Sequence, residues 1–473
     1  MTTSEEAVTM RKSIVLLTVA ASFAAVASAA DRPPNIVIIF ADDMGYGDLG
    51  CYGHPSIRTP NLDRMASQGM RFTDFYCGAS VCTPSRAALM TGRYAPRCGM
   101  ASDKRRVLFP TSKGGLQADE VTIAEILKKQ GYATHAIGKW HLGHLPQYLP
   151  TSHGFDTYFG IPYSNDMDRL AAKGPKGRAA FLEPRVEYWN CPLMRGTEVV
   201  ERPAEQTTIT RRYTEEAVKF IKQDKDRPFF IYLAHNLPHV PLFRHKEFEG
   251  RSLRGLYGDV IEEIDWSVGQ VLEAIREQGL EKDTVVWFTS DNGPWLIFND
   301  HGGSAGPLFE GKGCSWEGGQ RVPGIAWGPG RIPAGRITSE LASTLDFLPT
   351  AAALAGAKPP TDRTLDGYDL TAFITGKTDK SPRDRFFYYR DEAIYAVRQG
   401  PYKAHFTTRS AYGPDKPVKH DPPLLFHLGV DPGEKWNVAS QHPDVVERLI
   451  KLAGEQDAGL KAPPSQLENE NIK

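Results

Sequence analysis

Hydrophobic residues in the first three-quarters of the chain form short apolar runs that are separated by amphipathic stretches. Residues 35–40 read NIVIIF, a continuous and mostly β-branched run that is typical of a strand buried on both faces. Three further strands are predicted, at residues 132–137, 229–233 and 284–289. Helices are predicted between the strands, at residues 123–130, 214–222 and 259–275. This alternation indicates an α/β domain with a mostly parallel sheet flanked by helices.

The helix at 123–130 carries recognisable signals at both ends. Thr122 and Glu125 have the spacing of a capping box, in which each side chain bonds the backbone N–H of the other residue. Gly131 supplies the residue that commonly ends a helix. We therefore expect this helix to begin directly after Thr122 and to stop before Gly131.

The pattern changes after a predicted helix at 346–354. Short apolar runs separated by turn signals are followed by a last helix near 445–452, which indicates a small antiparallel sheet with one helix. We place the domain boundary at residue 375, with a catalytic domain at 31–375 and a small C-terminal α+β domain at 376–473. The short runs lie at residues 393–397, 402–406 and 424–428.

The first thirty residues have the composition of a secretory signal peptide. Arg11 and Lys12 precede an apolar run at 14–26, and the small residues ASAA follow at 27–30. The apolar run is too short for a lasting membrane span, so we expect an exported, periplasmic or secreted protein without a stable membrane anchor. The alternative is a leader that stays uncleaved and serves as an anchor.

Composition narrows the class of protein further. The chain has 473 residues, of which 41% are hydrophobic and 24% charged, as in an ordinary soluble enzyme. Its formal net charge of -1 gives no indication of a nucleic-acid or membrane-surface partner. Six cysteines are too few to define a disulfide framework, and the sequence does not assign any pairing.

Polar residues follow directly after each of the four predicted strands. The carboxyl ends of the strands in an open parallel sheet lie at one edge, where ligands bind. Three carboxylates and one amide in this set are hard oxygen donors, which suit Ca²⁺ or Mg²⁺, and we expect calcium because it tolerates more ligands. Taken singly, such Asp-Asp and Asp-Asn-Gly sequences are also ordinary turns. The residues are Asp42 and Asp43, Lys139 and His141, His235 and His239, and Asp291 and Asn292.

The motif CTPSR at residues 82–86 precedes an apolar, alanine-rich stretch. Pro84 is well placed for the first turn of a helix. Cys82 would then lie at a helix N-terminus, where unpaired backbone N–H groups and the helix dipole favour an anion. The alternative interpretation is a small buried cysteine that only packs before a helix.

The CTPSR motif is the sulfatase signature, and other segments extend the resemblance over nearly the whole chain after residue 31. The sequence resembles the branch of the family that contains arylsulfatase A and N-acetylgalactosamine-6-sulfatase. This resemblance implies an alkaline-phosphatase-like α/β fold with a small C-terminal domain. The other matching segments are residues 32–54, GKWHLG at 138–143, TSDNG at 289–293 and EGG at 317–319.

The same resemblance implies a modified nucleophile. Cys82 would be oxidised to Cα-formylglycine by a formylglycine-generating enzyme that reads Thr83, Pro84 and Arg86. A thiolate would give a stable thiosulfate ester, whereas the hydrated aldehyde offers one hydroxyl for attack and a second to expel sulfate. Arg86 is expected to steady this hydrate near the metal.

Roles for the remaining residues are also carried over from the family. Asp42, Asp43, Asp291 and Asn292 match calcium ligands, and modified Cys82 would complete the shell with a sulfate oxygen. The metal would act as a Lewis acid.

Substrate contacts come from side chains outside this metal set. Lys139 and Lys312 match lysines that hold sulfate oxygens, and Ser164 matches a minor sulfate contact. His141 matches the base that regenerates the aldehyde, and His239 the group that assists the departing oxygen.

The implied function is hydrolysis of a sulfate ester on a small molecule or oligosaccharide, with a sulfated carbohydrate or an aryl sulfate as the expected substrate. Two alternatives stay open at this point. One is a phosphate or phosphonate ester hydrolase of the same superfamily, and the other is an unmodified, inactive sulfate-binding homologue. We interpret His235 as structural, and His405 and His420 either as residues at the substrate mouth or as surface residues.

Overall fold

The computed structural model describes residues 32–170, 173–412 and 416–469. Pro33–Lys473 form one compact unit, and the predicted signal peptide at 1–30 lies outside the described residues. Among the described residues, none of the helices combines the length and the apolar character that a bilayer crossing requires.

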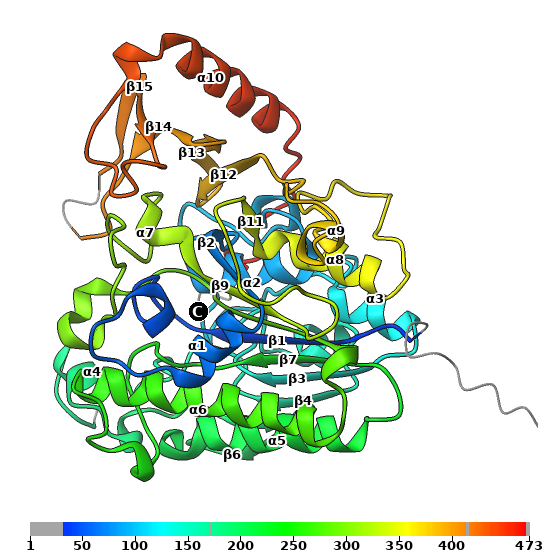
Figure 1. The fold of residues 1–473 in the computed structure, drawn as a ribbon. Helices are drawn as coiled ribbons and strands as arrows, with labels where there is room; N and C mark the ends of the chain where they lie inside the picture. Colours follow the sequence, from blue (N-terminus) through cyan, green and yellow to red (C-terminus); the bar gives the residue numbers. More distant parts are fainter. Residues whose placement is uncertain (1–31, 171–172, 413–415, 470–473) are drawn as a thin grey trace, which may run out of the picture. The chain divides into compact units, whose positions relative to one another are not determined.

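A large mixed sheet forms the centre of this unit (Figure 1). The strand order is β10-β2-β9-β8-β1-β7-β3-β4-β5-β6, and β11 also pairs with β2. β1 is parallel to both of its neighbours, β7 and β8, whereas β9 runs antiparallel between β8 and β2. The mostly parallel sheet predicted from the sequence is therefore confirmed. The strands are β1 Asn35–Ala41, β2 Met70–Tyr76, β3 Ala133–Gly138, β4 Thr157–Gly160, β5 Leu193–Arg195, β6 Glu198–Glu201, β7 Phe229–Ala234, β8 Thr284–Ser290, β9 Arg321–Trp327, β10 Arg336–Thr338 and β11 Ala342–Ser343.

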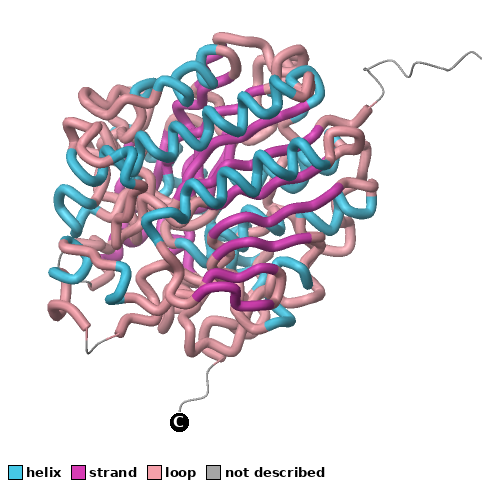
Figure 2. The backbone as a smooth tube through the Cα atoms, turned by 90° about the horizontal axis from the view of Figure 1, so that it is seen from below, coloured by secondary structure: helices cyan, strands magenta, loops and turns pink. Residues whose placement is uncertain are grey.

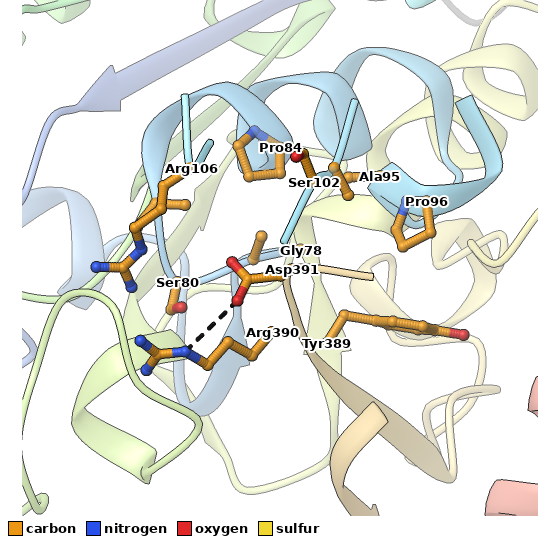
Figure 3. Close-up of a pocket in the computed structure, with 13 residues that line it drawn as sticks. Gly78, Ser80, Pro84, Ala95, Pro96, Ser102, Arg106, Tyr389, Arg390 and Asp391 are labelled. Atoms are coloured by element: carbon orange, nitrogen blue, oxygen red, sulfur yellow. Dashed lines mark ion pairs between the residues drawn. The ribbon is translucent and has the colours of Figure 1, made fainter. Parts of the chain in front are cut away.

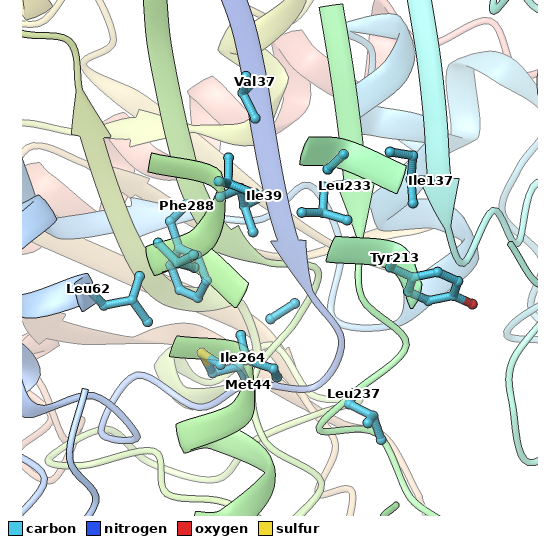
Figure 4. Packing of buried hydrophobic residues seen from close by; sticks show 14 of the residues in the cluster. Val37, Ile39, Met44, Leu62, Ile137, Tyr213, Leu233, Leu237, Ile264 and Phe288 are labelled. Carbon is cyan, nitrogen blue, oxygen red and sulfur yellow. The ribbon is translucent and has the colours of Figure 1, made fainter. Parts of the chain in front are cut away.

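Alternate side chains of β1 enter two different hydrophobic cores. Val37 and Ile39 pack into one core, where Figure 4 shows them beside Leu233 of β7 and Phe288 of β8. Residues 36, 38 and 40 of the same strand point to the opposite face and join the other core. Every residue of β1 is buried, which explains why its sequence is apolar without alternation.

Helices cover both faces of the large sheet, and Figure 2 shows helices laid across one face of the strands. The core on one face contains side chains of α1 Pro60–Ser67, α5 Ile209–Gln223 and α6 Gly255–Glu277. The core on the other face contains side chains of α2 Cys82–Thr91, α3 Ile123–Lys129, α8 Phe347–Leu354 and α9 Thr371–Ile374. Two further short helices are α4 Ala179–Leu182 and α7 Glu317–Gln320. The sheet is thus enclosed between two helical layers.

The ends of α3 are confirmed as predicted, whereas α5 begins earlier than expected. The hydroxyl of Thr122 accepts the backbone N–H of Glu125 at 3.2 Å, and the Glu125 carboxylate accepts the N–H of Thr122 at 2.7 Å. The start predicted for α5 at residue 214 is wrong by five residues. Thr214 lies inside the helix, where its hydroxyl donates back to the Thr210 carbonyl at 2.7 Å.

Strand β9 contains a proline although it lies between two other strands. Pro323 has no N–H to donate, and such a residue argues against a central strand in a sequence. The register of β2 shifts opposite this point, since Phe72 pairs with Gly324 and Phe75 pairs with Val322. The extra residue in β2 is a bulge, and it accommodates the position at which β9 lacks a donor.

A second, antiparallel sheet with one helix follows the large sheet in the chain, as predicted (Figure 1). Its hairpins pair β12 with β13, β13 with β14 and β14 with β15. The elements are β12 Arg385–Arg390, β13 Ala393–Gln399, β14 Tyr402–Thr408, β15 Val418–His427 and α10 Pro443–Ala458. β12 was not predicted, and the last strand is longer than the expected run at 424–428.

Buried polar side chains join the two sheets around Glu317 of α7. The Glu317 carboxylate accepts the hydroxyls of Tyr76 on β2 and Tyr388 on β12, both at 2.6 Å, and the ammonium of Lys403 on β14 at 3.0 Å. Burial alone would raise the pKa of Glu317, but the positive charges of Lys403 and Arg321 hold it well below the usual value. Glu317 is therefore an ionised anchor shared by both sheets.

Candidate active site

The predicted polar residues meet where the parallel strands end. Asp42 and Asp43 follow β1, Lys139 and His141 follow β3, His239 follows β7, and Asp291 and Asn292 follow β8. The ligand atoms of Asp42, Asp43, Cys82 and His239 all lie within 4.8 Å of one another. The gathering of side chains at this edge follows directly from the parallel order of β8, β1, β7 and β3.

The backbone is unusual at two of these positions. Asp43 has a φ of 64° and His141 a φ of 61°, in the left-handed region that residues other than glycine rarely adopt. The backbone N–H of Asp43 donates to Asp291 Oδ1 at 3.1 Å, and that of His141 donates to the Pro162 carbonyl at 3.1 Å. These bonds hold both side chains in orientations that an extended strand would not give them.

Cys82 is the first residue of α2 and is buried. Its Sγ lies 3.6 Å from Asp42 Oδ1 and 3.5 Å from the ammonium of Lys312. Burial raises the pKa of the Cys82 thiol, and the nearby lysines only partly oppose this. The thiol is therefore protonated at neutral pH and is not an activated thiolate.

Three buried carboxylates and one amide lie next to Cys82, and together they are called the acidic floor: Asp42, Asp43, Asp291 and Asn292. Burial raises the pKa of Asp43 to about 7, and the negative charges of Asp42 and Asp291 add to this rise. Asn292 donates from Nδ2 to Asp43 Oδ1 at 2.6 Å, while its own Oδ1 is buried without a hydrogen-bond partner among the described residues. Repelling carboxylates beside an unpaired amide oxygen fit a hard divalent cation with oxygen ligands.

Arg86 packs against the acidic floor and has no exposed surface of its own. Its guanidinium donates from Nε and Nη2 to Asp291 Oδ2 at 3.1 and 2.9 Å, and from Nη1 to the Lys139 carbonyl at 2.8 Å. Nη2 also lies 3.5 Å from Asp42. Arg86 is fully buried, so its contact with the reacting group runs through the carboxylates that it orients.

Two lysines flank Cys82. The ammonium of Lys139 donates to Asp42 and, at 3.1 Å, to the hydroxyl of Ser164. The ammonium of Lys312 contacts both oxygens of Asp43, at 2.7 and 2.8 Å. Ser164 is thus connected to the site through Lys139. Lys312 is therefore placed to bind an anion in front of Cys82, whereas the fully buried Lys139 adds its positive charge through its contacts with Asp42 and Ser164.

Two buried histidines face the same space. His141 contacts the Leu108 carbonyl through Nε2 at 2.9 Å, so Nε2 carries the proton and Nδ1, which has no partner among the described residues, is a free base. His239 contacts the Val240 carbonyl through Nδ1 at 2.6 Å, and its Nε2 lies 3.6 Å from Asp43. Burial lowers the pKa of both rings, so both are neutral at neutral pH.

A pocket of about 590 Å³ opens above these groups. Five predicted residues line it directly, namely Cys82, His141, Ser164, His239 and Lys312. The outer walls of the pocket were not predicted from the sequence, although the run of three bases at 104–106 was a visible signal. The missed lining residues are Val81, Lys104, Arg105, Arg106, Val107, Phe109, Asp166, Met167 and Trp295.

A second cavity lies on the other side of the start of α2. Figure 3 shows Pro84 of α2 in its wall, and the ion pair of Arg390 with Asp391 at the end of β12. Its volume is about 20 Å³, which is enough for roughly one water molecule. None of the predicted catalytic side chains lines it, so the pocket of about 590 Å³ is the candidate substrate pocket.

Three histidines and the other cysteines lie away from this pocket. His235 is buried and its Nε2 contacts the Ser267 hydroxyl at 3.2 Å, in keeping with a structural role. His405 is fully buried, with its Nε2 at 2.7 Å from the Glu434 carboxylate, and it does not line the pocket. Both interpretations of His405, as a residue of the substrate mouth or of the surface, are therefore wrong. His420 contacts the Thr408 hydroxyl at 2.8 Å, also outside the pocket. All six cysteines are free in this structure.

An acidic floor, a helix N-terminus with its cysteine and two flanking lysines define a hydrolase site for an anionic ester. The family model "Sulfatase" matches residues 34–357, and that of the "C-terminal region of aryl-sulfatase" matches residues 381–473. The chain belongs to the sulfatase family and is a sulfuric ester hydrolase.

Curated relatives and solved structures agree with this placement. Arylsulfatase A of Homo sapiens is 45% identical over 92% of this chain and 90% of its own length. N-acetylgalactosamine-6-sulfatase of Mus musculus is 40% identical over 96% of this chain and 91% of its own length. The crystal structure of Ps i-CgsB in complex with k-i-k-neocarrahexaose has a TM-score of 0.76 and 32% identity, covering 93% of this chain and 96% of the other. The family implies a metal site, and the cluster around Asp42 has the chemistry for one.

Proposed function

We propose that this enzyme hydrolyses sulfate monoesters with a hydrated Cα-formylglycine, made from Cys82, as its nucleophile. The observation that carries the proposal is the position of Cys82 as the first residue of α2, between Asp42 and Lys312. The hydrated aldehyde supplies one hydroxyl that attacks sulfur and a second that expels sulfate. A formylglycine-generating enzyme that reads Thr83, Pro84 and Arg86 would produce it.

We further propose calcium as the metal. Asp42, Asp43, Asp291 and Asn292 would hold it, because all four are buried and offer hard oxygen donors. Asp42 and Asp43 lie in one cluster with Cys82, and Asp291 and Asn292 are hydrogen-bonded to Asp43. When bound, calcium supplies Lewis acidity and lowers the pKa of the attacking hydroxyl. Arg86 fixes the orientation of the Asp291 carboxylate through its two hydrogen bonds.

The other side chains act on the substrate. The ammonium groups of Lys139 and Lys312 bind the sulfate oxygens and offset the charge that develops on them. Nδ1 of His141 accepts the proton of the second hydroxyl, since its Nε2 is committed to Leu108. His239, which lines the same pocket, would assist the departing ester oxygen of the leaving group.

A sulfated carbohydrate is the substrate class we propose, with an aryl sulfate as the second choice. Two observations on relatives support it. The name of one is N-acetylgalactosamine-6-sulfatase, and a solved neighbour is in complex with a neocarrahexaose. The volume of about 590 Å³ is in the range of pockets that enclose small ligands. The leader at 1–30 supports a proposed periplasmic or secreted location.

Hydrolysis of a phosphate or phosphonate ester is the rival activity. A phosphatase that uses two zinc ions needs a second set of histidine and aspartate ligands. Among the described residues, one group of side chains is close enough to hold a metal ion, namely Asp42, Asp43, Cys82 and His239. This group has room for a single ion. This donor set argues against a two-zinc phosphatase, and we propose phosphatase activity only as a secondary reaction.

Mass spectrometry of the proteolytic peptide that carries Cys82 tests the proposal directly. Protein from the native host should contain the aldehyde, and sulfate release from an aryl sulfate should follow the modified fraction. Cys82→Ala should abolish turnover. Cys98→Ala is the matched control, because Cys98 is also buried but contacts the Ala95 carbonyl and not the pocket. An intact, alkylatable thiol in fully active enzyme would refute the proposed nucleophile. An intact thiol in protein that releases no sulfate would instead favour the unmodified sulfate-binding alternative.

A further inference from the structure

Asp166 is a carboxylate on the wall of the substrate pocket whose hydrogen bonding is incomplete. It lines the same pocket as Cys82 and follows Ser164 by two positions. Its Oδ1 is buried and has no hydrogen-bond partner among the described residues. An unpaired buried acceptor costs stability, so a residue of this kind calls for a ligand that completes it.

The cations nearest to Asp166 are bound to other groups. Lys139 donates to Asp42 and Ser164, and Lys312 contacts Asp43 and Cys82. Neither forms an ion pair with Asp166. Their charges and the Ser164 hydroxyl only moderate the rise that burial causes in the pKa of Asp166. The carboxylate is therefore near the sulfate position without belonging to the sulfate-binding set.

A carboxylate repels the sulfate group itself, so its partner must belong to the leaving group. The free oxygen can accept from a hydroxyl or an amide N–H. Trp295 and Met167 line the same pocket with apolar surface. The Trp295 ring lies 5.3 Å from the ring of His239, the residue proposed to assist the leaving group. An acceptor and an aromatic surface in one pocket match a pyranose, which has hydroxyls at its edge and C–H groups on its face.

We propose that Asp166 is a specificity-determining residue that accepts a hydrogen bond from a hydroxyl of a sugar leaving group. This inference rests on the proposed sulfatase reaction and narrows its substrate to hydroxyl-bearing carbohydrates. A flat aryl leaving group without that hydroxyl leaves Asp166 unpaired. A site built around a substrate hydroxyl discriminates strongly against analogues that lack it.

The test compares substrates as well as variants. We would measure kcat/KM for methyl galactoside 6-sulfate, for its single-deoxy analogues and for 4-nitrophenyl sulfate, with mature wild type, Asp166→Ala and Asp166→Asn. In the wild type, removal of the one hydroxyl that Asp166 binds should lower kcat/KM by about 10- to 100-fold. In Asp166→Ala the same deoxy analogue should differ from its parent by less than about threefold.

Asp168→Asn is the matched control. Asp168 lies outside the pocket lining, and its carboxylate is already bonded to the Tyr163 hydroxyl at 2.7 Å and to Arg202. It should leave the ratio of sugar to aryl kcat/KM unchanged, whereas Asp166→Ala should lower that ratio at least tenfold. A structural role for Asp166 predicts instead a lower melting temperature for Asp166→Ala. We expect a melting temperature at or above that of the wild type, because the substitution removes an unpaired acceptor.

The possible outcomes separate this inference from the proposed function. Asp166 does not bind the leaving group if Asp166→Ala lowers kcat/KM for the sugar sulfate and for the aryl sulfate by the same factor. The same conclusion follows if each deoxy analogue loses as much kcat/KM in Asp166→Ala as it does in the wild type. If the mature wild type releases no sulfate from either class of substrate, the proposed reaction itself is wrong. If Asp166→Ala removes the effect of deleting one particular sugar hydroxyl, the result supports both the role of Asp166 and the proposed sulfatase reaction.

Discussion

Replacing Asp291 with asparagine removes one negative charge from the acidic floor beside Cys82 and keeps the size of the side chain. In the wild type, Asp291 Oδ2 accepts two hydrogen bonds from Arg86, at 3.1 and 2.9 Å. Arg86 has no exposed side-chain surface, so Asp291→Asn leaves a buried guanidinium short of a partner. Breaking a buried ion pair from one side costs about 3–5 kcal/mol. Asp42, 3.5 Å from Arg86, retains part of the pairing, so we expect about 3 kcal/mol of lost stability in chelator.

Calcium should add a second difference. An ion that binds the native state alone stabilises it by about 2.7 kcal/mol when its concentration is about 100 times its Kd. The wild type should gain this amount between chelator and calcium. Asp291→Asn should gain much less, because one of its three carboxylate ligands has become a neutral amide.

The measurement is urea unfolding in chelator and in calcium, together with the metal content of the purified protein. Asp265→Asn is the control, since Asp265 is a buried carboxylate of α6 that bonds Asn61 and the backbone N–H of Leu62, and it does not take part in the site. It should be less stable than the wild type but should gain the same amount from calcium. A full calcium gain and unchanged metal content in Asp291→Asn would refute the ligand assignment.

Two further changes test other parts of the structure. Glu317→Gln removes one of the two carboxylates that pair with buried Lys403, and Glu434 stays at 2.9 Å. We therefore expect a loss of about 3 kcal/mol, at the low end of the range for a broken buried ion pair, measured by thermal unfolding. The positive charges of Lys403 and Arg321 lower the pKa of Glu317, so its ionised form stabilises the wild type above about pH 4.3. This stabilisation fades as the pH falls below that value, and Glu317→Gln should lack this part of the acid sensitivity. An unaltered dependence of stability on acid pH in the variant would contradict the pairing. His141→Ala should lower kcat by about 10²- to 10⁴-fold in protein whose fraction of modified Cys82 equals that of the wild type. The measurement is sulfate release at saturating substrate, and a change in KM alone would show that His141 is not the base.

Local signals gave the most reliable structural predictions. The capping box of Thr122 and Glu125 placed the start of α3 correctly, because its determinants lie within four residues. The buried run at 35–40 predicted β1 correctly, because a strand in the middle of a parallel sheet needs apolar residues on both faces. By contrast, β9 contains Pro323, and only the bulge in β2, distant in sequence, makes a strand possible there.

The candidate site divides in the same way. The carboxylates and the amide could be predicted from their positions after strands, because parallel strands bring their ends together. Lys312 follows no predicted strand, and only the family resemblance indicated it. The pocket walls at Asp166 and Trp295 belong to loops, whose positions depend on tertiary contacts that the sequence does not display. Glu317 was matched as part of a motif, yet its role as an anchor between the sheets appeared only in the structure.

The position of β1 also bears on which parts of the pocket can vary. Both edges of β1 are hydrogen-bonded to parallel strands and both of its faces are packed, so its amides should exchange with solvent only on global unfolding. Asp42 and Asp43 extend directly from that slow-exchanging segment. The outer wall at 104–109 has no regular secondary structure and is partly exposed. Substitutions in this outer wall could therefore change which leaving group fits while the chemistry beneath stays in place.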